Sequence, residues 1–277
     1  MVNSQGHFVW YELITADMPA ARAFYASVIG WEMRDASMPG MAYTLCSTAR
    51  GSVCGFVDVA AEASPAGEKP CWIGYVGVDD VDAAATCAIA HGGVVEVVPQ
   101  TVPEVSRFAI LTDPQFVPFG VLKWLMPRPQ PAASDTPGEI GWHELMARDE
   151  AGAFDFYHAL FGWQKAGSEP GPAGMYQLFS AGGETIGGML KKPPDAPSAL
   201  WLHYFNVGDI DAAVKRATDG GGQLLHGPTA VPGDKWAVQC MDPHGAVFAM
   251  MGRRKPGPVG YFKRAEPGQS SSTRFGG

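Results

Sequence analysis

The sequence predicts an α+β protein of two tandem domains, each made of two βαβββ modules whose mixed sheets close around a shared cavity. Three observations support this. Residues 10–31 recur at 142–163, where 9 of 22 aligned positions are identical. Residues 72–84 recur at 201–213, with 7 of 13 positions identical. A stretch rich in Pro and small polar residues, 127–138, separates the two halves and has the composition of a linker.

These repeats set the expected boundaries. Domain 1 spans 1–126, the linker 127–138 and domain 2 139–252, and the remainder, 253–277, is a basic tail rich in Gly, Pro and Ser. We interpret the tail as a solvated or surface-draped extension. A single module of about 55 residues cannot cover both faces of its sheet. The modules must therefore pair, either 1 with 2 and 3 with 4, or 1 with 4 and 2 with 3.

Each module is expected to begin with a strand and continue into a helix. In the first module a strand covers 8–14, and Asp17 is a candidate N-cap with Pro19 in the first turn. Apolar residues then follow at helical spacing until Gly30, which can end the helix. Shorter strands are expected near 43–46 and 53–59.

The second module repeats this order. Its strand opens at Trp72, its helix follows a cap at 79–80 and ends near 92–93. Three further strands are expected near 94–98, 108–111 and 121–125. In the C-terminal half the corresponding second helix covers 210–217 and stops at 220–222.

Composition limits the partners. The chain has 277 residues and a formal charge of −8, which argues against nucleic acid as the main partner. No apolar run approaches the roughly 20 residues that a bilayer span needs, and Glu12, Asp17 and Arg22 interrupt any signal-peptide core. Five cysteines without a C-x-x-C pair fit a reducing compartment. We expect a cytoplasmic monomer or homodimer with a small-molecule ligand.

The motifs shared by the two halves are Asp17 with AFY (23–25) and GW (30–31), Asp149 with DFY (155–157) and GW (162–163), and the DP turns at 113–114 and 242–243. They resemble those of the vicinal oxygen chelate superfamily, which includes glyoxalase I, extradiol dioxygenases and bleomycin-resistance proteins. The resemblance covers about 7–126 and 139–252, and the W-x-E-L opening strand is most similar to bacterial two-domain glyoxalase-like proteins. Fold membership says little about chemistry.

The resemblance implies a divalent metal held by His and Glu on strand positions that face the cavity. On the opening strands those positions correspond to Trp10 and Trp142, and on the last strands to Gly120 and Ala249. None of these side chains can ligate a divalent ion. The remaining positions fall on Trp72 or Ile73 and on Trp201 or Leu202, which are equally unsuitable. We therefore expect no metal ligands and no cofactor, with a divalent metal as the alternative.

Two carboxylates are the candidate catalytic residues. In a strand, residues i and i+2 share a face, so Glu12 points the same way as Trp10 and Glu144 the same way as Trp142. A buried carboxylate is costly without a partner. Each glutamate is therefore either a structural residue with a hydrogen-bonding or ionic partner, or a general base or metal ligand one pleat deeper.

Aromatic residues are the candidate ligand-binding set. They line a flat apolar pocket for a planar organic molecule, or they fill an ordinary core. The set is Trp10, Trp72, Tyr75, Trp142, Trp201 and Tyr204. Strand alternation turns His143 and His203 the opposite way, toward the covering helices.

Two classes of function remain open. The first is a metal-free binding protein that resembles the drug-sequestering branch of the superfamily. The second is an enzyme, either a metal-dependent lyase or isomerase or a dioxygenase or hydroxylase, that uses Glu12 or Glu144. In a third case one domain keeps a site and the other is purely structural.

Overall fold

The computed structural model describes residues 4–38, 40–58, 70–126, 135–171, 174–194 and 196–255. Most of the expected linker (127–138) and of the expected tail (253–277) lies outside these residues. Within the described ranges no helix is long and apolar enough to cross a bilayer.

Each domain contains two modules of one helix and four strands. The first domain comprises β1 (Phe8–Thr15), α1 (Met18–Val28), β2 (Glu32–Asp35), β3 (Tyr43–Thr48), β4 (Gly51–Asp58), β5 (Cys71–Gly77), α2 (Val81–Ala90), β6 (Val94–Val102), β7 (Ser106–Thr112) and β8 (Pro118–Trp124). The second comprises β9 (Ile140–Ala147), α3 (Glu150–Phe161), β10 (Gln164–Gly171), β11 (Gly174–Ala181), β12 (Glu184–Lys191), β13 (Leu200–Val207), α4 (Ile210–Asp219), β14 (Gln223–Val231), β15 (Lys235–Met241) and β16 (Val247–Gly252). The predicted α+β fold of tandem modules is confirmed.

The helices begin where the sequence predicts. The side chains of Asp17, Asp80, Asp149 and Asp209 each accept a hydrogen bond from the backbone N–H three residues later. These contacts satisfy one of the N–H groups that the first turn of a helix leaves without a partner. At the end of α3, Gly162 has a φ of 71°, a left-handed conformation that glycine adopts without strain.

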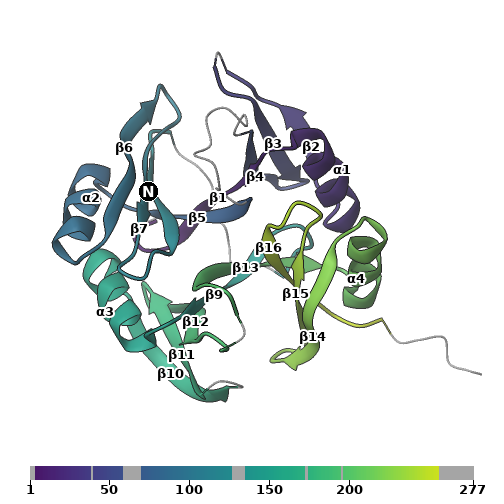
Figure 1. Ribbon diagram of the computed structural model, residues 1–277. Helices are drawn as coiled ribbons and strands as arrows, with labels where there is room; N and C mark the ends of the chain where they lie inside the picture. The colour runs from purple at the N-terminus through teal and green to yellow at the C-terminus, as the bar shows by residue number, and fades with distance from the viewer. Residues whose placement is uncertain are drawn as a thin grey trace, which may run out of the picture.

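Each domain forms one mixed, eight-stranded sheet. The strand orders are β2-β3-β4-β1-β5-β8-β7-β6 and β10-β11-β12-β9-β13-β16-β15-β14. Modules 1 and 2 therefore share a sheet through the antiparallel pair β1–β5, and modules 3 and 4 through β9–β13. The two curled sheets lie back to back, with their concave faces turned away from each other (Figure 1).

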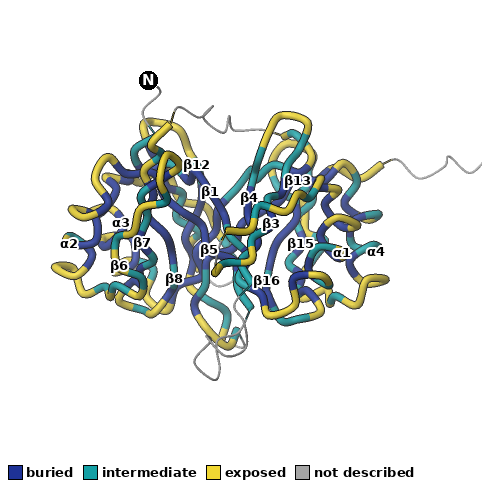
Figure 2. Tube along the Cα trace, turned by 90° about the horizontal axis from the view of Figure 1, so that it is seen from above, coloured by how far each residue is buried: buried dark blue, intermediate teal, exposed yellow. Residues whose placement is uncertain are grey.

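The helices pair in the other combination. Helix α1 packs against α4, and α2 packs against α3, at the two sides of the molecule (Figure 1). One large hydrophobic core fills the space between the convex faces of the sheets and these helices. The buried segments accordingly concentrate along the middle of the molecule, where the central strands of both sheets meet (Figure 2). Both pairings that the sequence left open thus occur, one through the sheets and the other through the helices.

Tyrosines of the AFY and DFY motifs connect the two domains. The Tyr25 hydroxyl on α1 donates to Asp242 Oδ2 of the second domain at 3.1 Å. Symmetrically, the Tyr157 hydroxyl on α3 donates to Asp113 Oδ2 of the first domain at 3.2 Å. Each aspartate also accepts two backbone N–H bonds within its own DP turn. The same arrangement of one carboxylate and one phenol therefore crosses the domain interface twice.

Tryptophans of the GW motifs make a second pair of links. The Trp31 indole N–H donates to the Gly138 carbonyl, and the Trp163 indole N–H donates to the Gly6 carbonyl, each at 2.7 Å. In both cases a ring at the end of a helix fixes the chain that leads into the other domain. The repeated motifs are thus explained by the packing of the two domains.

Candidate carboxylate sites on the concave faces

Alternation along β1 separates two environments. Tyr11 and Leu13 face the large core, whereas Trp10 belongs to a smaller apolar cluster on the concave face. Glu12 lies between Tyr11 and Leu13 in the sequence, so its side chain points to the concave face, like that of Trp10. On β9 the equivalent cluster contains Trp142, and Glu144 lies beside it. Each concave face therefore places one carboxylate in apolar surroundings.

In domain 1 two tyrosine hydroxyls hold the Glu12 carboxylate. Tyr75 on β5 donates to Oε2 at 2.6 Å, and Tyr43 on β3 donates to Oε1 at 2.8 Å. The Trp10 indole N–H in turn donates to the Tyr43 hydroxyl oxygen at 3.1 Å. Because both phenol protons go to the carboxylate, Glu12 has the partners that a buried carboxylate needs.

Glycines on neighbouring strands make room for these rings. Gly55 pairs with Glu12 in the parallel register of β1 and β4, and a Cβ there would overlap the Tyr43 ring. Gly120 pairs with Tyr75 in the register of β5 and β8, and a Cβ there would overlap the Tyr75 ring. The aromatic rings thus lie directly over two backbone positions without side chains.

Domain 2 repeats the arrangement. The Tyr204 hydroxyl donates to Glu144 Oε1 at 3.1 Å, and Tyr176 also hydrogen-bonds the carboxylate. The Trp142 indole N–H donates to the Tyr176 hydroxyl oxygen at 2.7 Å. The Gln239 amide adds a donor, with its Nε2 3.3 Å from Glu144 Oε1. This last residue has no polar counterpart in domain 1.

Burial raises the pKa of both carboxyl groups. The pKa of Glu144 rises to about 6, and that of Glu12 lies above its usual value, because desolvation outweighs the hydrogen bonds from the tyrosines. Burial, and then the neighbouring carboxylates, raise the pKa values of Tyr43, Tyr75 and Tyr204 above their usual range. The phenols therefore stay protonated and remain hydrogen-bond donors.

Six of the eight predicted site residues come together in these two sites. They are Trp10, Glu12, Tyr75, Trp142, Glu144 and Tyr204.

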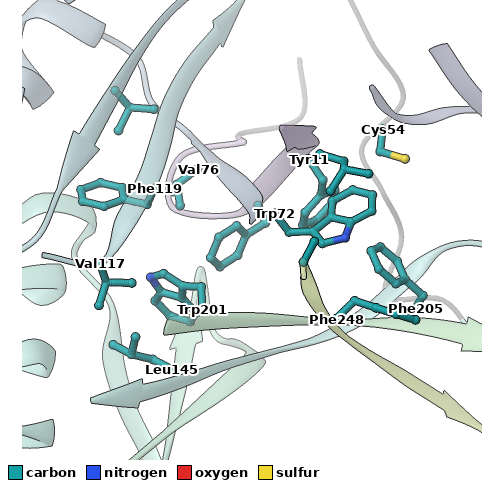
Figure 3. Close-up of a cluster of buried hydrophobic side chains, with 14 of the residues drawn as sticks. Tyr11, Cys54, Trp72, Val76, Val117, Phe119, Leu145, Trp201, Phe205 and Phe248 are labelled. Atoms are coloured by element: carbon teal, nitrogen blue, oxygen red, sulfur yellow. The ribbon is translucent and has the colours of Figure 1, made fainter. Parts of the chain in front are cut away.

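Trp72 and Trp201 lie on the other side of their strands, in the large core (Figure 3). Their indole N–H groups donate to the Tyr25 and Tyr157 hydroxyls, at 3.0 and 2.9 Å. Trp72 precedes Tyr75 by three residues, and an odd separation along a strand gives opposite faces. These two tryptophans therefore contact the interdomain tyrosines and not the carboxylates.

Sequence reasoning did not identify Tyr43, Tyr176 or Gln239. A signal existed for the two tyrosines, because a Tyr-x-Leu pattern recurs at 43–45 and 176–178 on short strands that follow each first helix. No such signal existed for Gln239, since its repeat equivalent is Ile110.

Two histidines lie between the sheets. The Nδ1 atoms of His143 and His203 are 3.2 Å apart, and the Tyr11 hydroxyl is 3.3 Å from His143 Nε2. The prediction that both turn away from the concave face is correct, but the opposite sheet covers them, where helices were expected. Burial lowers the pKa of both, that of His203 to about 3.

The donor set of the carboxylate sites does not fit a divalent metal. Each site offers one carboxylate, and its other polar atoms are protonated phenols, an indole N–H or an amide. Zinc, manganese and iron sites use several carboxylate, imidazole or thiolate ligands. Among the described residues no group of three or more His, Cys, Asp or Glu side chains could hold a metal ion.

Comparison with known proteins agrees with the fold. The family model described as "Glyoxalase/Bleomycin resistance protein/Dioxygenase superfamily" matches residues 5–119 and 139–250. A protein of Mycobacterium bovis named "Putative glyoxylase CFP32" is 30% identical over 257 residues, which cover 92% of this chain and 96% of that protein. The "Anthracycline biosynthesis protein DnrV" of Streptomyces peucetius is 28% identical over 264 residues, which cover 90% of this chain and 94% of that protein.

Solved structures show the same architecture at low identity. The Mn(II)-bound glyoxalase from Novosphingobium aromaticivorans has a TM-score of 0.59 at 17% identity, covering 91% of this chain and 83% of its own. The 2,3-dioxygenase LapB from Pseudomonas sp. KL28 has a TM-score of 0.61 at 12% identity, covering 94% of this chain and 96% of its own. At such identities the likeness concerns the fold alone.

Proposed function

Because the chain belongs to the glyoxalase, bleomycin resistance protein and dioxygenase superfamily, we propose that it binds a small, planar organic molecule on an aromatic concave face without a metal ion. One observation carries this proposal. A carboxylate held by two tyrosine hydroxyls sits among apolar side chains on the concave face, and the same construction appears in both domains.

The lining suits a flat apolar skeleton. Around Glu12 the half-buried side chains of Phe108 and Trp124 lie against the apolar cluster that contains Trp10. Rings of this kind contribute burial and directed stacking, while a few polar groups set the orientation of the ligand. The relative from Streptomyces peucetius supports the class of ligand, since its name refers to the biosynthesis of anthracyclines, which are planar polycyclic aromatic compounds.

A second function follows from the pKa of Glu144. A general base works best when its pKa lies near the ambient pH, and burial raises the pKa of this carboxyl group to about 6. A metal-independent isomerase or lyase that moves a proton through Glu144 is therefore the enzymatic candidate. Tyr204 and Tyr176 would then orient the carboxylate toward the substrate.

The test is a binding screen with planar aromatic compounds, monitored by calorimetry on chelator-treated and on untreated protein. We expect saturable binding that chelation leaves unchanged, and at least about a tenfold loss of affinity in Glu12→Gln. Elemental analysis after incubation with Zn, Ni, Mn and Fe(II) salts provides the counter-test. Retention of about one metal ion per chain together with ligand binding that depends on the metal would refute the proposal.

A further inference from the structure

The two carboxylate sites differ at one position that faces the glutamate. Gln239 on β15 and Ile110 on β7 occupy equivalent places in their sheets, since they pair with Ala249 and Gly120 on the neighbouring strand. The carboxylate, the two phenols and the indole otherwise recur in both domains. Among the polar groups that contact the glutamates, Gln239 is therefore the difference between the two sites.

In domain 2 the Gln239 side-chain amide is an N–H donor directed at the carboxylate site. Its Nε2 lies 3.3 Å from Glu144 Oε1 and 3.5 Å from the Tyr204 hydroxyl oxygen. In domain 1 the aliphatic side chain of Ile110 packs on the apolar cluster and supplies no donor. The acceptors that the amide contacts in domain 2 are still present in domain 1, as Glu12 and Tyr75.

The polar groups of the domain 1 site determine which charge and hydrogen-bonding groups a ligand must carry. The hydroxyl protons of Tyr43 and Tyr75 both go to Glu12, so the hydrogen-bonding capacity left on these three side chains is that of oxygen lone pairs. Such a surface accepts hydrogen bonds and attracts positive charge, and the surrounding rings add cation–π attraction. An anionic ligand would meet like charge there.

We infer that the domain 1 site binds a protonated organic amine on a planar apolar skeleton, with its N–H group beside Glu12 where the Gln239 amide lies beside Glu144. Domain 2 supplies this donor from its own chain and takes no such ligand. This inference rests on the proposed function, because it names the ligand class and the domain that receives it.

Three probes with one skeleton test the charge preference on the full-length protein. We would titrate 2-naphthylmethylamine, 2-naphthylmethanol and 2-naphthoate at neutral pH by calorimetry. The amine should bind at one molecule per chain, about tenfold or more tighter than the alcohol, and the carboxylate should not bind measurably. Equal or tighter binding of 2-naphthoate would overturn the inference.

Exchanging Gln239 and Ile110 between the domains tests which domain binds the amine. Gln239→Ile should raise the amine stoichiometry from one to two per chain, and Ile110→Gln should weaken binding about tenfold or more. Matched exchanges on exposed strand positions, Gln223→Ile and Val98→Gln, should leave stoichiometry and affinity unchanged. Unfolding curves of each variant confirm that it is folded.

The outcomes separate the two proposals. If none of the three probes binds, the proposed function fails and the inference fails with it. If the probes bind without preference for the amine, or if two molecules bind to the unaltered chain, only the inference fails. Because the probe series uses the unaltered protein, it decides the question even if both exchange variants fail to fold.

Discussion

The imidazole rings of His143 and His203 share one hydrogen bond between their Nδ1 atoms, 3.2 Å apart in the core between the sheets. Only one of the two Nδ1 atoms can carry a proton in this bond, so the contact becomes repulsive once both rings are protonated. His203 Nε2 is buried without a hydrogen-bond partner within the described residues. It faces Gly74, where even a Cβ would overlap the ring. A proton on this buried nitrogen therefore has no acceptor among the described residues.

Acid should destabilise the protein through this pair. Burial lowers the pKa of His203 from 6.5 to about 3, so between these values the unfolded chain takes up a proton that the folded chain excludes. Stability then falls as the pH falls, by about 1.4 kcal/mol per pH unit for His203. His203→Gln should reduce this slope in denaturant titrations from pH 7 to 4, whereas exposed His226→Gln should not. An unchanged slope in His203→Gln would contradict the assignment.

Glu144 should act in the opposite direction. Burial raises the pKa of its carboxyl group from 4.5 to about 6, so the folded chain holds the proton more tightly and loses stability as the pH rises through this window. The difference corresponds to about 2 kcal/mol. Relative to the unaltered protein, Glu144→Gln should therefore gain about this amount between pH 4 and 7. Exposed Glu184→Gln is the control, and it should show no such gain.

The interdomain tyrosines should affect stability without affecting the ligand. Tyr25→Phe leaves the Trp72 indole N–H and an Asp242 carboxylate oxygen without their shared hydroxyl in the core. Such a loss costs about 1–3 kcal/mol. Urea titration should show this decrease while calorimetry shows unchanged ligand affinity. A loss of affinity with unchanged stability would instead place Tyr25 at a binding site.

Gly55 and Gly188 form a matched pair that tests which domain binds. A Cβ at either position would overlap the ring of Tyr43 or Tyr176, and overpacking of this kind costs about 1–3 kcal/mol. Both Gly→Ala variants should lose similar stability in denaturant titrations. Only Gly55→Ala should also weaken amine binding in calorimetry, because it displaces a ring that orients Glu12. Equal effects of both variants on binding would argue against a single binding domain.

Strand alternation and repetition predicted much of the fold and the placement of the candidate residues on the opening strands. The recurrence of Trp10 and Glu12 as Trp142 and Glu144 identified one face of each opening strand, and that face carries both carboxylate sites. The helix N-caps were equally predictable, because an aspartate before a periodic apolar run accepts a hydrogen bond from the backbone N–H three residues later. These features depend only on neighbours in the chain.

What lies across a sheet could not be predicted in the same way. Alternation turned His143 and His203 away from the concave face, but the covering surface is the other domain's sheet, which no local pattern specifies. The position of Trp72 at the start of a strand predicts a ligand-binding residue beside Tyr75, but the odd separation of the two residues assigns them to opposite faces of the sheet. Gln239 differs from its repeat equivalent, so a search for recurring residues passes over it.

The links that run from each helix to the other domain's DP turn have one further consequence. The turn at Asp113 is closed by Tyr157, and the turn at Asp242 is closed by Tyr25, so each half completes the other as two subunits of a symmetric dimer would. In a dimer of identical chains, however, one substitution alters both sites at once. Here the subunits are joined in a single chain, and Ile110 in one half can therefore coexist with Gln239 in the other. Covalent duplication permits two sites of the same construction to carry different selectivity.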